Sequence, residues 1–145
     1  MPQLSGSCHC GQVHVAIRTN VEPAAIVLRE CQCGFCRRHG AKTFADPAGE
    51  ASISGTERLT RYRFGQATAD FLLCSRCGVY VAAVIEHESR HFATINAAGL
   101  QIPLLATRSA TPVSYEGEDA EARRQRRLDR WMPVVLNEDR GAARA

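Results

Sequence analysis

Seven cysteines, gathered in three short motifs, constrain this sequence more than any other feature. They stand at Cys8 and Cys10, at Cys31, Cys33 and Cys36, and at Cys74 and Cys77. An odd number excludes a fully paired disulfide framework, and thiolates two or three residues apart can converge on one ion from a tight turn. A glycine after Cys10 and after Cys77 lets each turn adopt a positive φ. The pattern predicts metal binding or thiol chemistry rather than scattered core cysteines.

The seven thiolates divide into four plus three. The two pairs together would form the four-cysteine tetrahedron that suits zinc, and the triplet would hold a second zinc with its fourth position open, as in catalytic sites. Two alternatives remain: one cluster that mixes the motifs, and a triplet closed by a histidine such as His39. Weaker histidine candidates are His9, His14, His87 and His91. Iron in the four-cysteine site is a minor alternative to zinc.

Length and composition favour one compact domain over residues 1–145. The chain has 145 residues, of which 45% are hydrophobic and 23% charged, enough for a core and too few charges for a disordered chain. No apolar run approaches the roughly 20 residues of a membrane span. Residues 1–7 show no secretory signal pattern. We therefore expect a cytoplasmic protein, in a compartment that keeps thiols reduced.

Hydrophobic periodicity predicts a mostly β chain. Apolar residues alternate with polar ones over residues 13–17, which is typical of a half-buried strand. The other predicted β segments are residues 24–28, 60–64, 68–73, 79–85 and 91–95. The second and third of these form a predicted hairpin that leads into the last cysteine motif. Strands at such short spacing favour antiparallel sheets.

One helix is predicted over residues 118–130, with acidic residues in its first turn and a proline at 133 to end it. It belongs to a helical tail of about residues 111–145, which follows a motif-bearing part of about residues 5–100. The helix contains Arg123, Arg124, Arg126 and Arg127. Acidic residues interleave with them and the net charge is only +3, so we predict a solvated face and no nucleic-acid partner.

The motifs SCHCG at residues 7–11, CQCGFCRRHGA at 31–41 and CSRCG at 74–78 resemble those of the glutathione-dependent formaldehyde-activating enzyme family, which includes centromere-protein-V-like members. The resemblance implies a mainly β zinc-binding fold of the β-tent, Mss-four-like kind. It also implies a structural zinc on Cys8, Cys10, Cys74 and Cys77. A catalytic zinc is implied on Cys31, Cys33 and Cys36. One departure is Gly34, where members often carry serine or another small polar residue.

The reaction that the resemblance implies is that of a carbon-sulfur lyase, which joins glutathione or a related thiol to formaldehyde and gives the S-hydroxymethyl adduct. Arg37 and Arg38 follow the triplet and could offset thiolate charge or bind glutathione carboxylates. His39 is the nearest candidate to pass a proton to the new hydroxyl oxygen. The alternatives are the same fold acting on another thiol adduct, and a non-enzymatic zinc module that binds a protein or nucleic acid.

Overall fold

The computed structural model describes residues 3–138 of the chain, and strands dominate it. The strands are β1 (Gln3–Ser7), β2 (His14–Arg18), β3 (Arg29–Cys31), β4 (Thr43–Phe44), β5 (Glu50–Ser54), β6 (Leu59–Tyr62), β7 (Asp70–Cys74), β8 (Tyr80–His87), β9 (Arg90–Asn96), β10 (Thr111–Val113) and β11 (Met132–Asn137). The helices are α1 (Gly34–His39) and α2 (Ala120–Arg130), with short 3-10 turns η1 (Pro23–Ala25) and η2 (Thr56–Arg58). The mainly β prediction, the β6–β7 hairpin and the C-terminal helix are confirmed.

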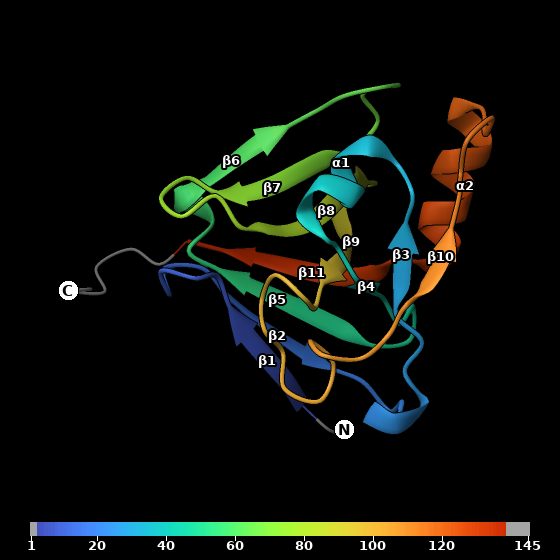
Figure 1. Cartoon of the computed structure of the whole chain (residues 1–145). Helices are drawn as coiled ribbons and strands as arrows, with labels where there is room; N and C mark the ends of the chain where they lie inside the picture. The colour runs from blue at the N-terminus through green and yellow to red at the C-terminus, as the bar shows by residue number, and fades with distance from the viewer. Residues whose placement is uncertain (1–2, 139–145) are drawn as a thin grey trace.

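The strands form a mixed sheet that branches at β9. One edge of β9 pairs with β11 and β4, and the other pairs with β8. One path runs from β1 through β2, β5 and β11 to β9 and on to β4, β3 and β10, while β8, β7 and β6 form a separate wing (Figure 1). Most pairs are antiparallel, as predicted. The exceptions are the pairs of β10 with β3 and of β11 with β5, which are parallel. In each pair a strand of the C-terminal part runs in the same direction as an earlier strand.

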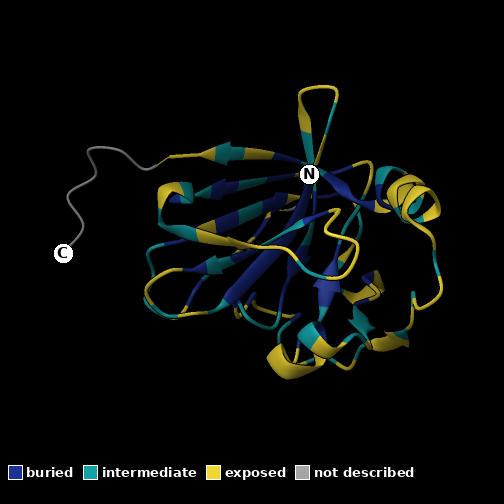
Figure 2. Ribbon diagram, turned by 90° about the horizontal axis from the view of Figure 1, so that it is seen from above, coloured by how far each residue is buried: buried dark blue, intermediate teal, exposed yellow. Residues whose placement is uncertain are grey.

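The hydrophobic core has two parts, and β8 contributes to both. Val84 belongs to the main cluster between the strands, whereas Tyr80 belongs to a second cluster that includes Cys36 and Trp131. Figure 2 shows the central strands buried while α2 and the outer loops are largely exposed. Each fully buried aliphatic or aromatic side chain contributes about 1.5–3 kcal/mol. The second cluster therefore provides apolar packing beside the cysteine triplet.

The prediction of a strand over residues 24–28 is wrong. Pro23–Ala25 form the 3-10 turn η1, and β3 begins only at Arg29. Pro23 favours the turn because its ring fixes φ and because it has no N–H to donate to a strand ladder. Ile26 and Leu28 are nevertheless 1% and 2% exposed. The apolar run thus predicted burial correctly and a strand incorrectly.

The predicted helical tail is helical only in part. After α2 the chain turns at Trp131 and enters β11, which lies between β5 and β9. Met132 and Val134 point into the core and are 0% and 6% exposed. Burial of these alternating apolar side chains favours a strand there. Residues 139–145, the last part of the predicted tail, lie outside the described residues.

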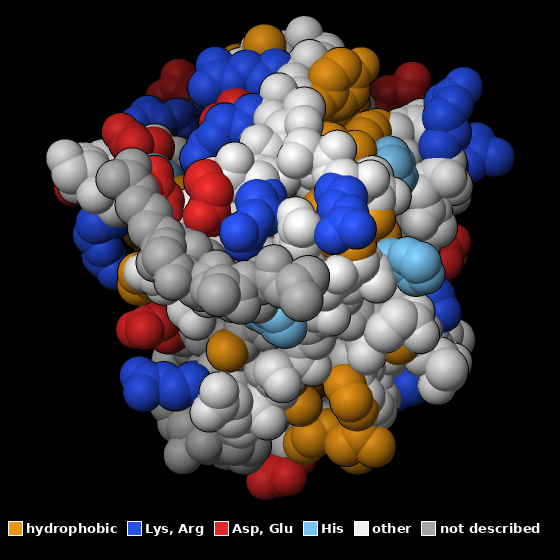
Figure 3. Space-filling view, turned by 90° about the vertical axis from the view of Figure 1, so that its left-hand side faces the viewer, with side chains coloured by type: hydrophobic (Ala, Val, Ile, Leu, Met, Phe, Trp, Pro, Cys, Tyr) orange, Lys and Arg blue, Asp and Glu red, His pale blue; other side chains and the backbone are white. Residues whose placement is uncertain are grey.

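Charge on the surface is mixed where Figure 3 shows it. Basic and acidic side chains are interspersed on that face, and neither sign forms a continuous patch there. No helix within residues 3–138 combines the length and hydropathy needed to cross a membrane.

Candidate metal centres and the adjoining cavity

The first and third cysteine motifs come together in space. Cys8 and Cys10 follow β1, while Cys74 ends β7 and Cys77 lies in the turn to β8. Their four Sγ atoms all lie within 4.8 Å of one another. The Sγ atoms of Cys8 and Cys10, and those of Cys10 and Cys74, are 3.6 Å apart. A tetrahedral ion with Zn–S bonds of about 2.3 Å needs S–S edges of about 3.8 Å, so this closed cluster could hold one metal ion.

Two similar glycine turns shape the closed cluster. The amide of Gly11, with φ +81°, donates to Cys8 O at 3.1 Å. The amide of Gly78, with φ +79°, donates to Cys74 O at 2.8 Å. Side chains rarely tolerate such φ values, which explains the glycine at both positions. The amide of Val13 also points at Cys8 Sγ, 3.4 Å away, and such donors stabilise a thiolate.

Burial and backbone amides set the thiol protonation of the closed cluster. Cys8 and Cys74 are each 2% exposed. Burial raises the pKa of Cys74 to about 12. At Cys77 burial acts in the same direction, but hydrogen bonds from the backbone amides of Val79 and Cys10 outweigh it and lower the pKa to about 6. Two of the four cysteines are therefore shielded from solvent, and the cluster favours negative charge at Cys77.

The second motif forms its own cluster at the start of α1, which we call the triplet. Cys31 ends β3, Cys33 is the N-cap of α1 and Cys36 lies in its first turn. The Sγ of Cys33 accepts a hydrogen bond from the amide of Cys36 at 3.3 Å, and the three Sγ atoms lie within 4.8 Å of one another. Within residues 3–138 no histidine or carboxylate joins them. The structure thus has two separate clusters, of four and three cysteines.

A hydrogen bond between thiols divides the charge of the triplet. Cys36 donates to Cys31, which lowers the pKa of Cys31 to about 6 in spite of burial. The same hydrogen bond, together with burial, raises the pKa of Cys36. The positive charge of Arg126 also contributes to the lowered pKa of Cys31. Negative charge therefore gathers at Cys31, within electrostatic reach of α2.

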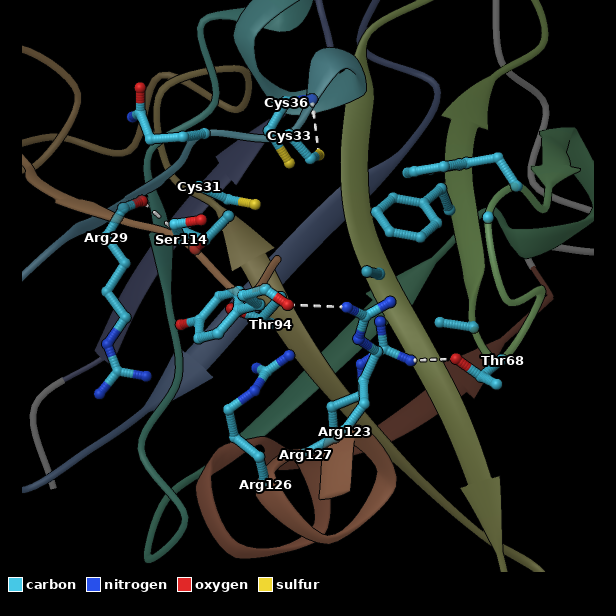
Figure 4. Close-up of a pocket in the computed structure, with 18 of the residues that line it drawn as sticks. Arg29, Cys31, Cys33, Cys36, Thr68, Thr94, Ser114, Arg123, Arg126 and Arg127 are labelled. Atoms are coloured by element: carbon cyan, nitrogen blue, oxygen red, sulfur yellow. Dashed lines mark hydrogen bonds between the residues drawn. The ribbon is translucent and has the colours of Figure 1, made fainter. Parts of the chain in front are cut away.

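All three cysteines of the triplet line a cavity of about 430 Å³, a volume typical of sites for small molecules. Figure 4 shows the triplet at one end of this cavity and Arg123, Arg126 and Arg127 at the other. The aromatic part of the lining is Phe64, Phe71, Tyr80, Tyr115 and Trp131. No cysteine of the closed cluster lines it. A small molecule can thus reach the triplet from a space that the closed cluster does not share.

Two of the α2 arginines share one carboxylate. Arg126 lies 3.0 Å from Glu118 and stacks on the Tyr115 ring at 3.5 Å from its centroid. Arg123 lies 3.1 Å from Glu118 and donates to Tyr115 O at 2.9 Å. These contacts, with the hydrogen bonds of Arg126 as the main cause, lower the pKa of Glu118. One carboxylate therefore neutralises only part of the positive charge at this end of the cavity. We call Arg123, Arg126 and Arg127 together the arginine wall.

Arg127 is the most buried member of the arginine wall, at 7% exposure. Its Nη1 donates to Thr68 Oγ1 at 2.7 Å, and its guanidinium lies 5.0 Å from the Trp131 ring centroid. Its Nε has no hydrogen-bond partner among the described residues. Burial, and then the charges of Arg126 and Arg123, lower its pKa to about 10, so it stays charged at neutral pH.

Tyr80 is within electrostatic reach of both the triplet and Arg127. It is 2% exposed and lines the cavity. Burial raises its pKa well above the ordinary value, the nearby triplet raises it further, and Arg127 acts in the opposite direction. The phenol therefore stays protonated at neutral pH. It can donate a hydrogen bond to an oxygen held in the cavity.

The other residues predicted from the second motif lie outside the cavity lining. Arg37, Arg38 and His39 are exposed on α1. The Nη1 of Arg38 donates to Gly34 O at 3.0 Å, and the His39 ring packs against Phe35 with centroids 4.4 Å apart. A Cβ added at Gly34 would meet only that Arg38 guanidinium, at 3.0 Å, so the packing there does not require glycine. The roles predicted for these residues stay predictions.

Sequence analysis missed the wall of the cavity opposite the triplet. The solvated face predicted for the α2 arginines is wrong for Arg127, which is buried. The available signal was spacing: Arg123, Arg127 and Trp131 follow at intervals of four and therefore share one helix face. Tyr80 carried no signal beyond its place in an apolar strand. Its role depends on which elements the fold brings beside it.

Comparison with known proteins assigns the family. The family model of the glutathione-dependent formaldehyde-activating enzyme matches residues 3–114, so the chain belongs to this family. The solved structure of a Rhodobacter sphaeroides protein, a Northeast Structural Genomics target, is similar at 31% identity and a TM-score of 0.56, covering 74% of this chain and 97% of that chain. The resemblance and the β-tent, Mss-four-like fold predicted from the sequence are confirmed. The family match ends before α2 begins.

Proposed function

We propose that this member of the glutathione-dependent formaldehyde-activating enzyme family is a zinc-dependent carbon-sulfur lyase, which joins glutathione or a related small thiol to formaldehyde and gives the S-hydroxymethyl adduct. One observation carries the proposal: the triplet lines a cavity of about 430 Å³, and no histidine or carboxylate among the described residues adds a fourth ligand to it. Three protein ligands with access to a cavity are typical of catalytic zinc, whereas four are typical of structural zinc.

The donor atoms fit two zinc ions, because sulfur ligands in tetrahedral arrangement suit this metal. The closed cluster would bind a structural zinc through Cys8, Cys10, Cys74 and Cys77. The triplet would bind the catalytic zinc through Cys31, Cys33 and Cys36. Zinc bound there supplies Lewis acidity, which favours the thiolate form of a substrate and polarises a carbonyl.

The reaction needs two reactants held together and one proton relocated. The thiol loses a proton, its sulfur bonds to the carbonyl carbon, and a C=O electron pair moves to the oxygen, which gains a proton. Because formaldehyde and thiols combine unaided, orientation within the cavity accounts for much of the expected acceleration. Phe64 and Phe71 contribute apolar surface to the lining, which would limit the water beside the reactants. The Tyr80 hydroxyl would donate a hydrogen bond to the oxygen as charge develops on it.

The exposed face of α1 would act on the site from outside the cavity. We assign His39 to proton exchange with solvent, because it is exposed and its ring centroid lies 5.7 Å from that of Tyr80. Arg37 and Arg38 would offset the charge of the thiolates at this end of α1. Carboxylate binding, also predicted for them, has no support from their position, since neither lines the cavity.

The cavity favours an enzyme over a pure interaction module. A binding module needs an exposed surface, whereas here the triplet faces an aromatic cavity sized for a small molecule. The partners we propose are therefore a small thiol and an aldehyde. We place the reaction in the cytoplasm, where the thiols of the chain and of its substrate stay reduced.

The proposal is tested by the rate of adduct formation. Exchange NMR with labelled formaldehyde and glutathione measures that rate with and without zinc-loaded protein. The wild type should accelerate the exchange, and Cys33→Ser should remove the acceleration while circular dichroism shows a folded domain. Ser75→Ala, in a turn of the closed cluster, is the matched control and should keep full activity. Wild-type protein with two bound zinc ions that accelerates no adduct with any common cellular thiol would reject the proposal.

A further inference from the structure

At the end away from the triplet, the cavity has an excess of positive charge. Its charged lining consists of Arg29, Glu116, Arg123, Arg126 and Arg127. Glu118 does not line the cavity but pairs with Arg123 and Arg126. Arginines therefore outnumber carboxylates in and beside the lining. Such a lining attracts anions and repels cations.

Within this lining, Arg127 is the buried charge that forms no ion pair with any described residue. It is 7% exposed, and its one hydrogen bond to a side chain is to the neutral Thr68 hydroxyl, at 2.7 Å. Its Nε donor has no partner among residues 3–138. A buried, unpaired guanidinium is costly unless something pairs with it. Because Arg127 lines the cavity, the missing partner can come from a bound molecule.

The position of Arg127 suits the far end of a substrate whose sulfur lies at the triplet. Figure 4 shows the triplet and the arginine wall at opposite ends of the same cavity. The arginine wall belongs to α2, whereas the family match covers residues 3–114. The three arginines at this end therefore come from a segment that follows the matched region.

We propose that Arg127 binds a carboxylate of the thiol substrate, so that the C-terminal helix selects thiols that carry a free carboxylate remote from sulfur. Guanidinium and carboxylate form paired, parallel hydrogen bonds, for which Nε is one of the two natural donors. For glutathione we assign the glycyl carboxylate to Arg127. The other carboxylate, on the glutamyl residue, is bonded to the same carbon atom as an ammonium group. The arginine wall would repel that ammonium group. This inference rests on the proposed function, since it takes the substrate to be a thiol.

Binding of S-methylglutathione tests the inference without catalysis, because the methylated sulfur cannot react. Calorimetry on the zinc-loaded protein at fixed salt would compare the wild type, Arg127→Gln and Arg124→Gln. Arg127→Gln should weaken binding at least about 10-fold, the loss expected for one charge-assisted pair. Arg124→Gln is the matched control and should bind within about twofold of the wild type. Arg124 lies on the same helix, contacts His87 at 2.7 Å and does not line the cavity.

A ligand series on the unaltered protein keeps the test valid even if Arg127→Gln does not fold. The glycyl ethyl ester of S-methylglutathione keeps the other carboxylate, and we expect it to bind the wild type at least about 10-fold more weakly than the free acid. Equal binding of ester and acid would overturn the inference, as would unchanged binding by folded Arg127→Gln. Acid-selective binding without catalysis would reject the proposed function alone. Catalysis that uses 2-mercaptoethanol as well as glutathione would reject the inference alone.

Discussion

The two cysteine clusters use the same side chain under different constraints. The closed cluster joins Cys10 to Cys74, which are 64 positions apart, and both motifs contribute to the rim of the main core. The triplet is confined to residues 31–36 and lines a cavity. A metal in the closed cluster would tie distant parts of the fold together. A metal in the triplet would constrain little beyond one short helix and would meet small molecules.

This difference shows that ligand type alone does not separate a structural site from a catalytic one. Sulfur donors and glycine turns are alike in the first and third motifs, and the triplet differs in being completed by no fourth described ligand. What distinguishes it further is its surroundings: aromatic side chains, the Tyr80 phenol and the arginine wall. Variants that change one cluster or its surroundings at a time test this distinction.

Loss of a closed-cluster ligand should have the largest effect. Cys74→Ser should prevent cooperative folding, because apparent binding energies of structural zinc, about 10–16 kcal/mol, match or exceed the whole stability of a domain. Cys33→Ser, the matched change in the triplet, should leave a folded protein. Thermal unfolding followed by circular dichroism measures both. If Cys33→Ser lowered the midpoint as much as Cys74→Ser, the division into structural and catalytic clusters would be reversed or shared.

Partial removal of metal should separate the clusters next. A chelator titrated into the two-zinc protein should take the zinc of the triplet first, since three ligands that face a cavity release an ion more readily than a closed set of four. Metal analysis should then show one zinc per chain with the far-UV circular dichroism unchanged. Simultaneous loss of both ions with unfolding would contradict this order.

The phenol beside the triplet should matter for rate and little for folding. Tyr80→Phe should lower the rate of adduct formation roughly 100-fold, as for other donors to a developing oxyanion, and change stability by about 1 kcal/mol. Tyr62→Phe is the control, because Tyr62 contacts the same Phe35 ring but is 48% exposed and does not line the cavity. Exchange NMR of both variants measures the difference. Equal rates for the two would remove Tyr80 from the mechanism.

The cysteine motifs predicted the site better than they predicted its walls. Their spacing indicated two metal clusters because ligand geometry is local: residues two or three apart must lie near one another in any fold. The same argument identified Gly11 and Gly78 as turn residues, and both have positive φ. It did not identify α1, because a cysteine turn and a first helical turn have the same spacing.

The rest of the site depends on contacts between distant segments. Arg127 reaches the cavity because α2 packs beside Tyr80 and Thr68, more than forty positions earlier in the chain. Periodicity indicated the helix but not that Arg127 would be covered. Met132–Asn137 likewise becomes a strand because β5 and β9 leave a place between them, whereas the local sequence contains a proline. Such tertiary effects override local preference.

The smallest predicted effect concerns the carboxylate of the arginine wall. The contacts with Arg126 and Arg123 lower the pKa of Glu118, so its stabilising charge is fully present above the ordinary value near 4.5 and is lost only as pH falls through the lower folded value. Glu118→Gln should therefore cost about 1 kcal/mol at pH 7, the scale of a partly exposed ion pair. The cost should be the same at pH 5.5, because both pH values lie above that window.

Glu121→Gln provides the matched control for Glu118→Gln, since Glu121 is exposed in the first turn of the same helix and does not line the cavity. It should change stability by a few tenths of a kcal/mol at most. Urea unfolding of the zinc-loaded variants at both pH values measures the difference. A loss for Glu118→Gln no larger than for Glu121→Gln would mean that the arginine wall is held by packing on Tyr115 and Trp131. A larger loss would show that the ion pairs of Glu118 with Arg123 and Arg126 stabilise the arginine wall. Arg127 forms no such pair with Glu118, and we propose that its carboxylate comes from the substrate.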